Sequence, residues 1–183
     1  MKIARNIYFK AFKIPILIGG LFIFIAAGQK IPSLKKVFKK DFYVGVAMNW
    51  RQIEGKSPSD IQLIKEQFNS TSPANVLKWS EVQPKPHSFQ WGPADAYVNF
   101  GLKHHMFIIG HNLVWHKQVP KWVFLDKKGK PVSRAVLLKR MKYHIDKVVG
   151  RYSGKINGWD VVNEALTEKG ELRNTKWKKI IGP

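Results

Sequence analysis

The stretch from Trp159 to Ala165 places a carboxylate, Glu164, directly after an amide, Asn163, where a short apolar strand should end. Parallel α/β enzymes carry their chemistry on polar residues at the carboxyl ends of strands. Apolar neighbours remove water from a carboxyl group, which raises its pKa and lets it keep a proton near neutral pH. The sequence therefore predicts Glu164 as a general acid, with a solvated surface glutamate as the alternative for this pair taken alone.

Polar and aromatic residues also follow two earlier stretches with strand character. Lys78 lies after the first of these, and His111 and Trp115 lie after the second. The carboxyl ends of barrel strands share one face, so we expect these side chains to gather near Glu164. Amides and imidazoles can bond hydroxyl groups, and indoles can cover the apolar face of a sugar ring, which favours a neutral polyhydroxylated ligand. Taken alone, Trp115 could simply be a core residue and Lys78 a solvated surface charge.

We expect no metal and no cofactor. Among the residues at the predicted strand ends, only His111 and His116 could form a metal-ligand pair close in sequence, and no carboxylate stands at ligand spacing from them. The chain has no Cys, which excludes disulfides, thiolate metal sites and a lipid anchor on Cys.

The elements that must position these residues alternate between strands and helices. A helix after Ser57 has Pro58 in its first turn, and a longer helix starts at Ser133 and is closed by Gly150 and Gly154. Alternation without hairpin turns indicates βαβ units and a parallel sheet, here of about four units. A closed eight-unit barrel needs ~250 residues, and the chain without its amino-terminal leader supplies roughly half of them. The predicted strands are 42–47, 70–75, 106–109 and 156–163, and further helices are predicted over 93–105 and from about residue 174.

The amino-terminal residues have the pattern of a targeting segment. Residues 1–28 combine basic residues with an uncharged apolar run over 14–27 and small residues at its end. This run is short for a membrane span, which needs ~20 residues, so we expect a cleaved signal peptide and a secreted protein, extracellular or periplasmic. An uncleaved N-terminal anchor is the alternative. Residues 29–40 are expected to be a basic linker and residues 41–183 a partial catalytic barrel.

The formal net charge is +20, with 32 basic against 12 acidic residues. This excess could attract anionic polymers or membranes. The sequence has no nucleic-acid-binding motif, so we expect no nucleic-acid partner, and no stable membrane partner unless the leader stays uncleaved.

Four motifs in order resemble those of glycoside hydrolase family 10, the endo-1,4-β-xylanases, and the resemblance covers roughly residues 40–183. The motifs are Asn75-x-x-Lys78-Trp79, Gly110-His111-x-Leu113-Val114-Trp115-His116, Gln118-x-Pro120-x-Trp122 and Trp159-Asp160-Val161-Val162-Asn163-Glu164-Ala165. The segment Phe89-Gln90-Trp91 with Ala94-Asp95 is similar to the family as well.

The resemblance implies an α/β fold, a (β/α)8 TIM barrel of which about the first four βα units are present. It implies cleavage of β-1,4-xylan or xylo-oligosaccharides with retention of configuration and no cofactor. Glu164 would be the general acid/base, and Asn163 would bond the 2-hydroxyl of the sugar being cleaved. The remaining implied substrate-binding residues are Lys78 and His111 at that sugar and its neighbour, Asn75 and Gln118 at further hydroxyls, and Trp115 as a wall.

Two features depart from the family. Ala74 stands where the family usually has a sugar-binding Glu, and Asn112 stands where a Thr is common. Retaining hydrolysis also needs a second carboxyl ~5–5.5 Å from the first, as the nucleophile, and no stretch here matches the family's nucleophile motif. The other glutamates, Glu54, Glu66, Glu81, Glu168 and Glu171, lie in predicted loops or helices.

We therefore expect the amino-terminal half of a xylanase, inactive as this chain alone. The alternative is a non-catalytic carbohydrate-binding half-barrel or a decayed enzyme. A basic protein of membrane surfaces is a third hypothesis, which leaves the clusters at the strand ends without a role.

Overall fold

The computed structural model describes residues 31–182. The structural features belong to one compact unit, residues 32–183. The predicted signal peptide or anchor, residues 1–28, lies outside the described residues. In order, the elements are α1 (Leu34–Val37), β1 (Gly45–Met48), α2 (Trp50–Ile53), α3 (Pro58–Gln67), β2 (Ser70–Pro73), α4 (Trp79–Val82), α5 (Gly92–Lys103), β3 (Phe107–Val114), α6 (Lys121–Phe124), α7 (Arg134–Arg151), β4 (Gly158–Val162) and α8 (Lys176–Ile181).

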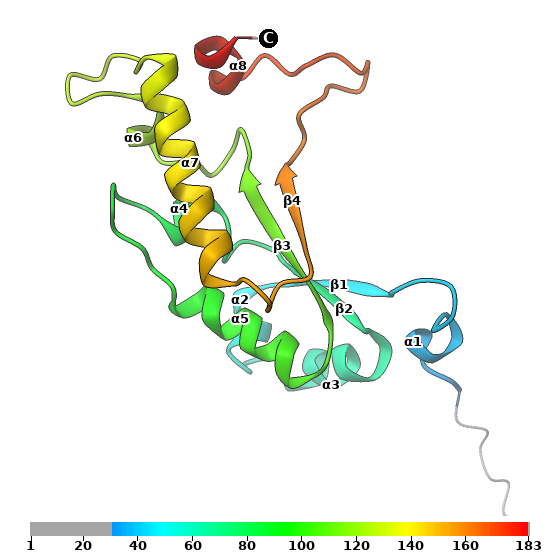
Figure 1. Ribbon diagram of the computed structural model, residues 1–183. Coiled ribbons are helices and arrows are strands. Elements are labelled where there is room, and N and C mark those ends of the chain that lie inside the picture. Colours follow the sequence, from blue (N-terminus) through cyan, green and yellow to red (C-terminus); the bar gives the residue numbers. More distant parts are fainter. Residues whose placement is uncertain (1–30, 183) are drawn as a thin grey trace, which may run out of the picture. The chain divides into compact units, whose positions relative to one another are not determined.

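The four strands form one parallel sheet in the order β1-β2-β3-β4. Helices α3, α5 and α7 separate successive strands, so the predicted βαβ units and parallel sheet are confirmed. The carboxyl ends of β3 and β4 point toward α8, while α5 and α7 lie along one side of these strands (Figure 1). Residues that follow β3 and β4 are thus brought to one end of the sheet.

The third strand is longer than its sequence predicted. The prediction ended it at Ile109, whereas β3 continues through His111 to Val114. The reason lies in its neighbour, because β4 pairs with this second half, Gly110 opposite Trp159 and His111 opposite Asp160. His111 therefore lies within a strand, and the prediction that it follows the strand end is wrong.

Most other boundaries agree with the prediction to within a few residues. Ser133 caps α7, and its hydroxyl accepts from Val136 N at 3.4 Å, as expected for an N-cap. Ser57 occupies the N-cap position of α3, but its side chain makes no capping hydrogen bond. Helix α7 runs past Gly150 to Arg151, and Gly154 adopts a positive φ of 72° in the turn beyond it.

Part of the stretch expected to be a linker is helical. Helix α1 lies against α3, where Leu34 N donates to Gln67 Oε1 at 3.0 Å and Lys35 Nζ donates to Lys65 O. Helix α1 thus belongs to the compact unit of residues 32–183.

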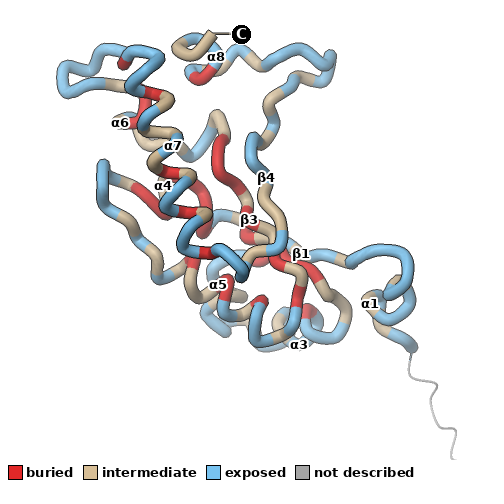
Figure 2. The backbone as a smooth tube through the Cα atoms, in the orientation of Figure 1, coloured by how far each residue is buried: buried red, intermediate tan, exposed pale blue. Residues whose placement is uncertain are grey.

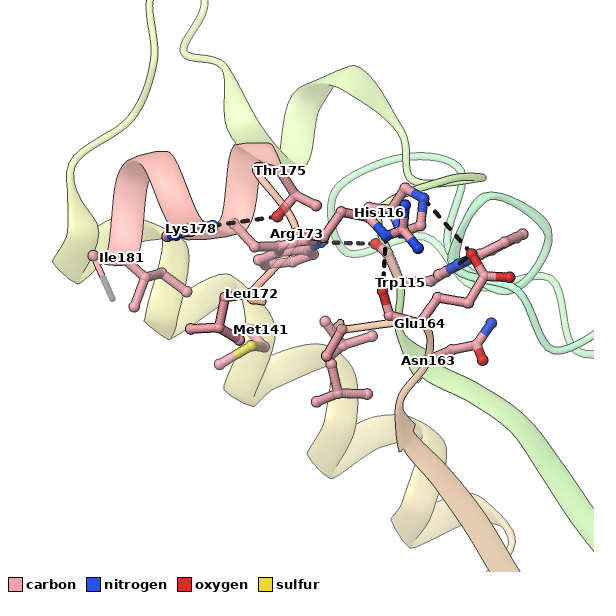
Figure 3. Close-up of a pocket in the computed structure, with 15 residues that line it drawn as sticks. Trp115, His116, Met141, Asn163, Glu164, Leu172, Arg173, Thr175, Lys178 and Ile181 are labelled. Carbon is pink, nitrogen blue, oxygen red and sulfur yellow. Dashed lines mark hydrogen bonds and ion pairs between the residues drawn. The ribbon is translucent and has the colours of Figure 1, made fainter. Parts of the chain in front are cut away.

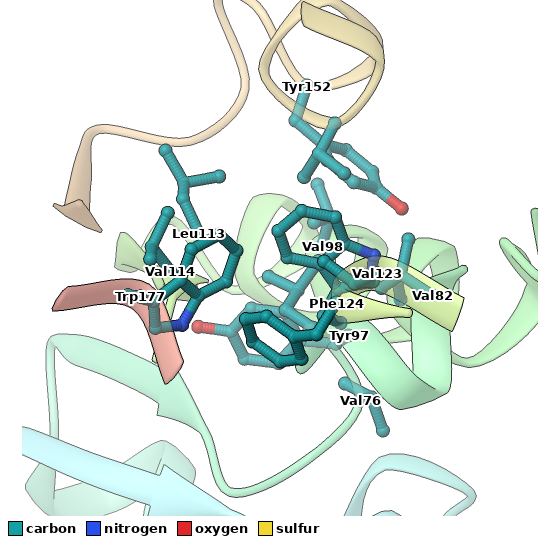
Figure 4. Close-up of a cluster of buried hydrophobic side chains, with 14 of the residues drawn as sticks. Val76, Val82, Tyr97, Val98, Leu113, Val114, Val123, Phe124, Tyr152 and Trp177 are labelled. Atoms are coloured by element: carbon teal, nitrogen blue, oxygen red, sulfur yellow. The ribbon is translucent and has the colours of Figure 1, made fainter. Parts of the chain in front are cut away.

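The core fills the space between the sheet and helices α4, α5 and α7 (Figure 4). The hydroxyl of Tyr97, a fully buried residue of α5, lies 2.8 Å from the carbonyl oxygens of both Thr71 and Ile109 and so links β2 to β3. Gly110 lets β4 approach, because a Cβ there would lie 2.1 Å from the Trp159 ring. Close packing of this kind fixes the spacing of the strands that carry the polar residues.

Strand β4 is one of the two edge strands of the sheet, and it is exposed. Its Val161 and Val162 are 55% and 57% exposed, and Figure 2 shows no buried residue along it. Such an edge presents unpaired backbone groups and apolar side chains that a further strand could cover. Within residues 31–182, no helix is long and apolar enough to cross a membrane.

Candidate active site

Glu164 follows β4 with its backbone in the left-handed region, at a φ of 50°. A non-glycine residue there costs on the order of 1–3 kcal/mol, and such residues cluster at functional sites. Two contacts hold the turn: Asn163 N donates to Val114 O at 2.9 Å, and Arg173 Nε donates to Glu164 O at 3.2 Å. These backbone contacts fix the position of Glu164 beside the ends of both β3 and β4.

The Glu164 carboxylate meets two side chains of the segment that follows β3 (Figure 3). Trp115 Nε1 donates to its Oε2 at 3.0 Å, and His116 Nε2 lies 3.7 Å from the same oxygen. Burial, with Arg173 nearby, lowers the pKa of His116, which disfavours its charged form, and the Glu164 carboxylate opposes this shift.

The expected rise in the pKa of Glu164 is not found. The Trp115 hydrogen bond lowers the pKa of this carboxyl below its ordinary value, helped by the cations Lys117 and Arg173. The side chain is 46% exposed, so desolvation, on which the prediction depended, is the weaker effect here. Without a ligand, Glu164 is therefore an ionised hydrogen-bond acceptor.

A chain of three polar side chains crosses from β4 to the segment before α4. His111 Nδ1 lies 2.7 Å from Asp160 Oδ2, and Lys78 Nζ lies 2.5 Å from His111 Nε2. The carboxylate can only accept, so Nδ1 carries the hydrogen and Nε2 accepts from the ammonium, which assigns a neutral imidazole from its partners. Lys78 is only 4% exposed, and burial lowers its pKa, opposed by the charges of Glu164 and Asp160.

The Lys78 ammonium also lies over the Trp115 ring, 4.1 Å from its centroid. The same indole therefore contacts Lys78 through its face and Glu164 through its N–H. Trp115 itself is fixed from behind, because Trp177 Nε1 donates to Trp115 O at 2.7 Å. This indole connects the lysine–histidine chain to the Glu164 carboxylate.

Two predicted amides pair with each other. Gln118 Nε2 donates to Asn75 Oδ1 at 3.1 Å, and the Gln118 backbone has a positive φ of 49°. Gln118 O accepts from Ser80 N at 2.9 Å, which joins the segments after β2 and β3. Both amides are exposed, so each can also bond a ligand hydroxyl.

A cavity of about 230 Å³ opens between the carboxyl ends of β3 and β4 and helices α7 and α8 (Figure 3). Glu164, Asn163 and Arg173 stand at its polar side, and Met141 and Leu172 form part of its apolar side. A polar group beside an apolar wall suits a ring with hydroxyl edges and a C–H face.

The structure brings together the predicted residues Lys78, His111, Trp115 and Glu164, with Asn163 beside the last. The Asn75–Gln118 pair joins the neighbouring segments after β2 and β3. Sequence reasoning assigned no role to Arg173 or Trp177, which contact Glu164 and Trp115 from the loop and helix after β4. No sequence pattern links those positions to the site, because their approach depends on how the chain returns after β4.

Within residues 31–182, the carboxylates in these networks are Glu164 and Asp160, and Asp160 is already bonded to His111. No group of three metal-binding side chains occurs in the same part of the chain.

The chain is similar to known enzymes over most of its length. The family model described as glycosyl hydrolase family 10 matches residues 33–183. Endo-1,4-beta-xylanase A of Xylanibacter ruminicola is 47% identical over 158 residues, which are 86% of this chain and 43% of that enzyme. Beta-1,4-xylanase of Dictyoglomus thermophilum is 43% identical, over 86% of this chain and 42% of its own length.

Solved structures agree with these similarities. TsXylA, the intracellular xylanase from Thermoanaerobacterium saccharolyticum, superposes with a TM-score of 0.79 at 40% identity, over 85% of this chain and 50% of that one. A mutant of it in complex with xylotetraose gives a TM-score of 0.79 as well, over 84% and 49%. The chain thus spans about half the length, or slightly less, of these relatives.

Proposed function

The chain belongs to glycosyl hydrolase family 10, and from this premise we propose that the protein cleaves β-1,4-xylan as a retaining endo-1,4-β-xylanase. Glu164 is the general acid/base. The observation that carries the proposal is the hydrogen bond of 3.0 Å from Trp115 to Glu164, which fixes an ionisable carboxyl at the end of β4. The complex of a similar enzyme with xylotetraose supports xylo-oligosaccharides as the ligands.

Glu164 must hold a proton when the leaving oxygen departs. A bound sugar would cover this half-exposed carboxyl and remove water from it, which shifts its pKa upward toward the protonated form. After glycosyl transfer the same carboxylate takes a proton from the attacking water. The low pKa of the ligand-free site suits the second role, and substrate burial supplies the first.

Lys78 and His111 bind hydroxyls of the sugar being cleaved and of its neighbour. The Asp160 carboxylate keeps the hydrogen of His111 on Nδ1, so Nε2 is an acceptor toward Lys78 or a sugar hydroxyl. The ammonium is already stripped of water, so a hydroxyl that contacts it displaces little solvent. Asn163 bonds the 2-hydroxyl, Asn75 and Gln118 bond further hydroxyls, and Trp115 covers a ring face.

The second carboxyl of a retaining mechanism must come from outside residues 1–183. Asp160 is bonded to His111, and Glu168 and Glu171 lie in the loop between β4 and α8. A four-stranded sheet with an open β4 edge supplies the acid/base side of the site, and a further set of strands supplies the nucleophile.

The test compares the 183-residue chain with a fusion. In the fusion, residue 183 is followed in frame by the carboxyl-terminal half of the Thermoanaerobacterium saccharolyticum xylanase. Reducing-sugar release from xylan should be negligible for the chain alone and substantial for the fusion. Robust release by the chain alone would mean that it holds a nucleophile of its own.

A non-catalytic carbohydrate-binding half-barrel is the second candidate, favoured because Glu164 is the one acidic residue among the described residues that line the cavity. The two functions separate in the fusion. Xylotetraose binding without hydrolysis by a folded fusion would favour the binding protein.

We also propose that the protein is secreted, on the basis of the leader pattern in residues 1–28. Intact-mass analysis of exported protein should show cleavage near Gly28. Protein that still starts at Met1 and stays in membranes would indicate an anchor instead.

A further inference from the structure

A second cleft, of about 420 Å³, lies between helix α7 and the loop that follows α4. It shares no lining residue with the cavity beside Glu164. We name it the Gln83 cleft, after the residue that combines complete burial with an unused hydrogen-bonding atom. Its lining residues include Gln83, His87, Trp122, Lys139, Arg140 and Tyr143.

Gln83 is fully buried, and only one of the two polar atoms of its side-chain amide has a hydrogen-bond partner among the described residues. Its Oε1 lies 3.0 Å from His144 Nδ1, and His144 is itself fully buried and stacked on Trp79. Its Nε2 has no hydrogen-bond partner among the described residues. Buried amide donors are normally paired, so the unpaired Nε2 is a polar group within the wall of the cleft.

The walls of the cleft are aromatic and held in place. The Trp122 indole is fixed by a hydrogen bond of 3.0 Å from its Nε1 to Pro84 O. The rings of Tyr143 and His87 meet edge to face, with centroids 5.1 Å apart. Rigid aromatic surfaces of this kind cover flat, partly apolar rings with little loss of side-chain entropy.

The rim is cationic. Lys139 and Arg140 both line the cleft, Lys147 lies 5.7 Å from the Tyr143 centroid, and no acidic residue is among the lining residues. Arg140 Nη1 donates to the carbonyl oxygens of Trp122, Val123 and Leu125. A negative charge on the ligand is therefore favoured at this rim.

We propose that the Gln83 cleft binds a uronate, a sugar ring that carries a carboxylate. The aromatic walls take the ring, and the carboxylate meets Lys139 and Arg140. The volume suits a ligand of one or two rings. This site is separate from the proposed hydrolytic site, so uronate binding at the cleft does not depend on whether the protein cleaves xylan.

The test is a ligand-observed NMR titration of the 183-residue chain with D-glucuronate, D-glucose and acetate as separate probes. Binding of glucuronate should be saturable. Glucose should bind about fivefold more weakly because it lacks the carboxylate charge, and acetate should show no saturable binding. Equal binding of glucose and glucuronate, or of acetate and glucuronate, would overturn the proposal, as would no saturable binding of glucuronate.

Substitutions inside and outside the Gln83 cleft test whether glucuronate binds there. Lys139→Ala should weaken glucuronate about fivefold and Tyr143→Ala about tenfold. Lys142→Ala is the matched control, because Lys142 lies on the same helix but outside the cleft and is paired with Asp146 at 2.6 Å. Lys139 and Lys142 are both exposed, so neither change threatens folding. Equal effects of the two substitutions, or displacement of glucuronate by a tighter-binding short acidic peptide, would reject the uronate site.

Discussion

Lys78 Nζ lies 2.5 Å from His111 Nε2, and the lysine that makes this contact is almost completely buried. A buried cation contributes little net stability, because its desolvation offsets its attraction to partners. His111 has a side chain that is 23% exposed, so water can replace the ammonium if the lysine is removed.

Lys78→Met should therefore separate stability from binding. The 183-residue chain should keep or raise its Tm, since a methionine of similar volume fills the space without a charge. In the fusion with a carboxyl-terminal half, xylotetraose affinity should fall by about 1.5–3 kcal/mol, roughly ten- to hundredfold in Kd. Calorimetry gives both quantities, and Lys103→Met, on the exposed surface of α5, is the control that should change neither. Unchanged affinity would remove Lys78 from the sugar site.

Trp115→Phe should raise the pKa of Glu164. The substitution keeps an aromatic ring and deletes the N–H whose hydrogen bond is the largest cause of the lowered pKa. The acid form then persists to higher pH. Carboxyl ¹³C NMR of the 183-residue chain measures this pKa directly. Trp122→Phe, which removes an indole bonded to Pro84 O, should leave it unchanged, and an unaltered titration in Trp115→Phe would refute the assignment.

His144 should make the fold sensitive to acid. Complete burial lowers its pKa to about 3, against an ordinary value of 6.5. The folded state thus binds a proton less readily than the unfolded state. Its contribution is fully present above pH 6.5 and is lost as pH falls toward 3, with a limiting slope of about 1.4 kcal/mol per pH unit.

Urea unfolding between pH 7 and pH 4.5 checks this, with His144→Phe as the test variant. Phe keeps the stack on Trp79 but cannot titrate, so the free energy of unfolding should depend less on pH than in the parent chain. At pH 7 the variant should be less stable by about 1–3 kcal/mol, because Gln83 loses its remaining partner. His87→Gln, at an exposed histidine, should keep the parental slope.

Two glycines should respond to alanine in opposite directions. Gly110→Ala places a Cβ 2.1 Å from the Trp159 ring, so β4 must move, at a cost of about 1–3 kcal/mol. Gly150→Ala meets nothing within 4 Å inside helix α7, and should stabilise by about 0.5–1 kcal/mol. Chemical denaturation of both variants measures this. Equal effects would show that the Gly110–Trp159 approach does not set the spacing of β3 and β4.

Local patterns were sufficient to predict the fold class, because the alternation of apolar runs with capped helices appears in the sequence itself. They could not predict the length of β3. The residues from Gly110 to Val114 are strand because β4 pairs with them, and that pairing is a long-range property. For the same reason His111 was expected beyond a strand that in fact contains it.

The motifs predicted Lys78, His111, Trp115 and Glu164 as one group, and the structure brings them together. The pKa direction of Glu164 failed because it depends on exposure and on an indole 49 positions earlier in the chain. Arg173 and Trp177 were missed because their approach follows from the course of the chain after β4. Sequence spacing thus identified the chemical groups, and tertiary contacts set their electrostatics.

In the proposed mechanism, Glu164 protonates the leaving oxygen. Glu164→Gln in the fusion tests it most directly, by comparing kcat on natural xylan with kcat on an aryl xyloside that has a good leaving group. The variant should lose about 10²–10⁴-fold in kcat on xylan. The rate at which the aryl xyloside forms the intermediate should fall much less, because a good leaving group needs little help from an acid. Full activity of the variant on xylan, or equal losses on both substrates, would contradict the role of Glu164.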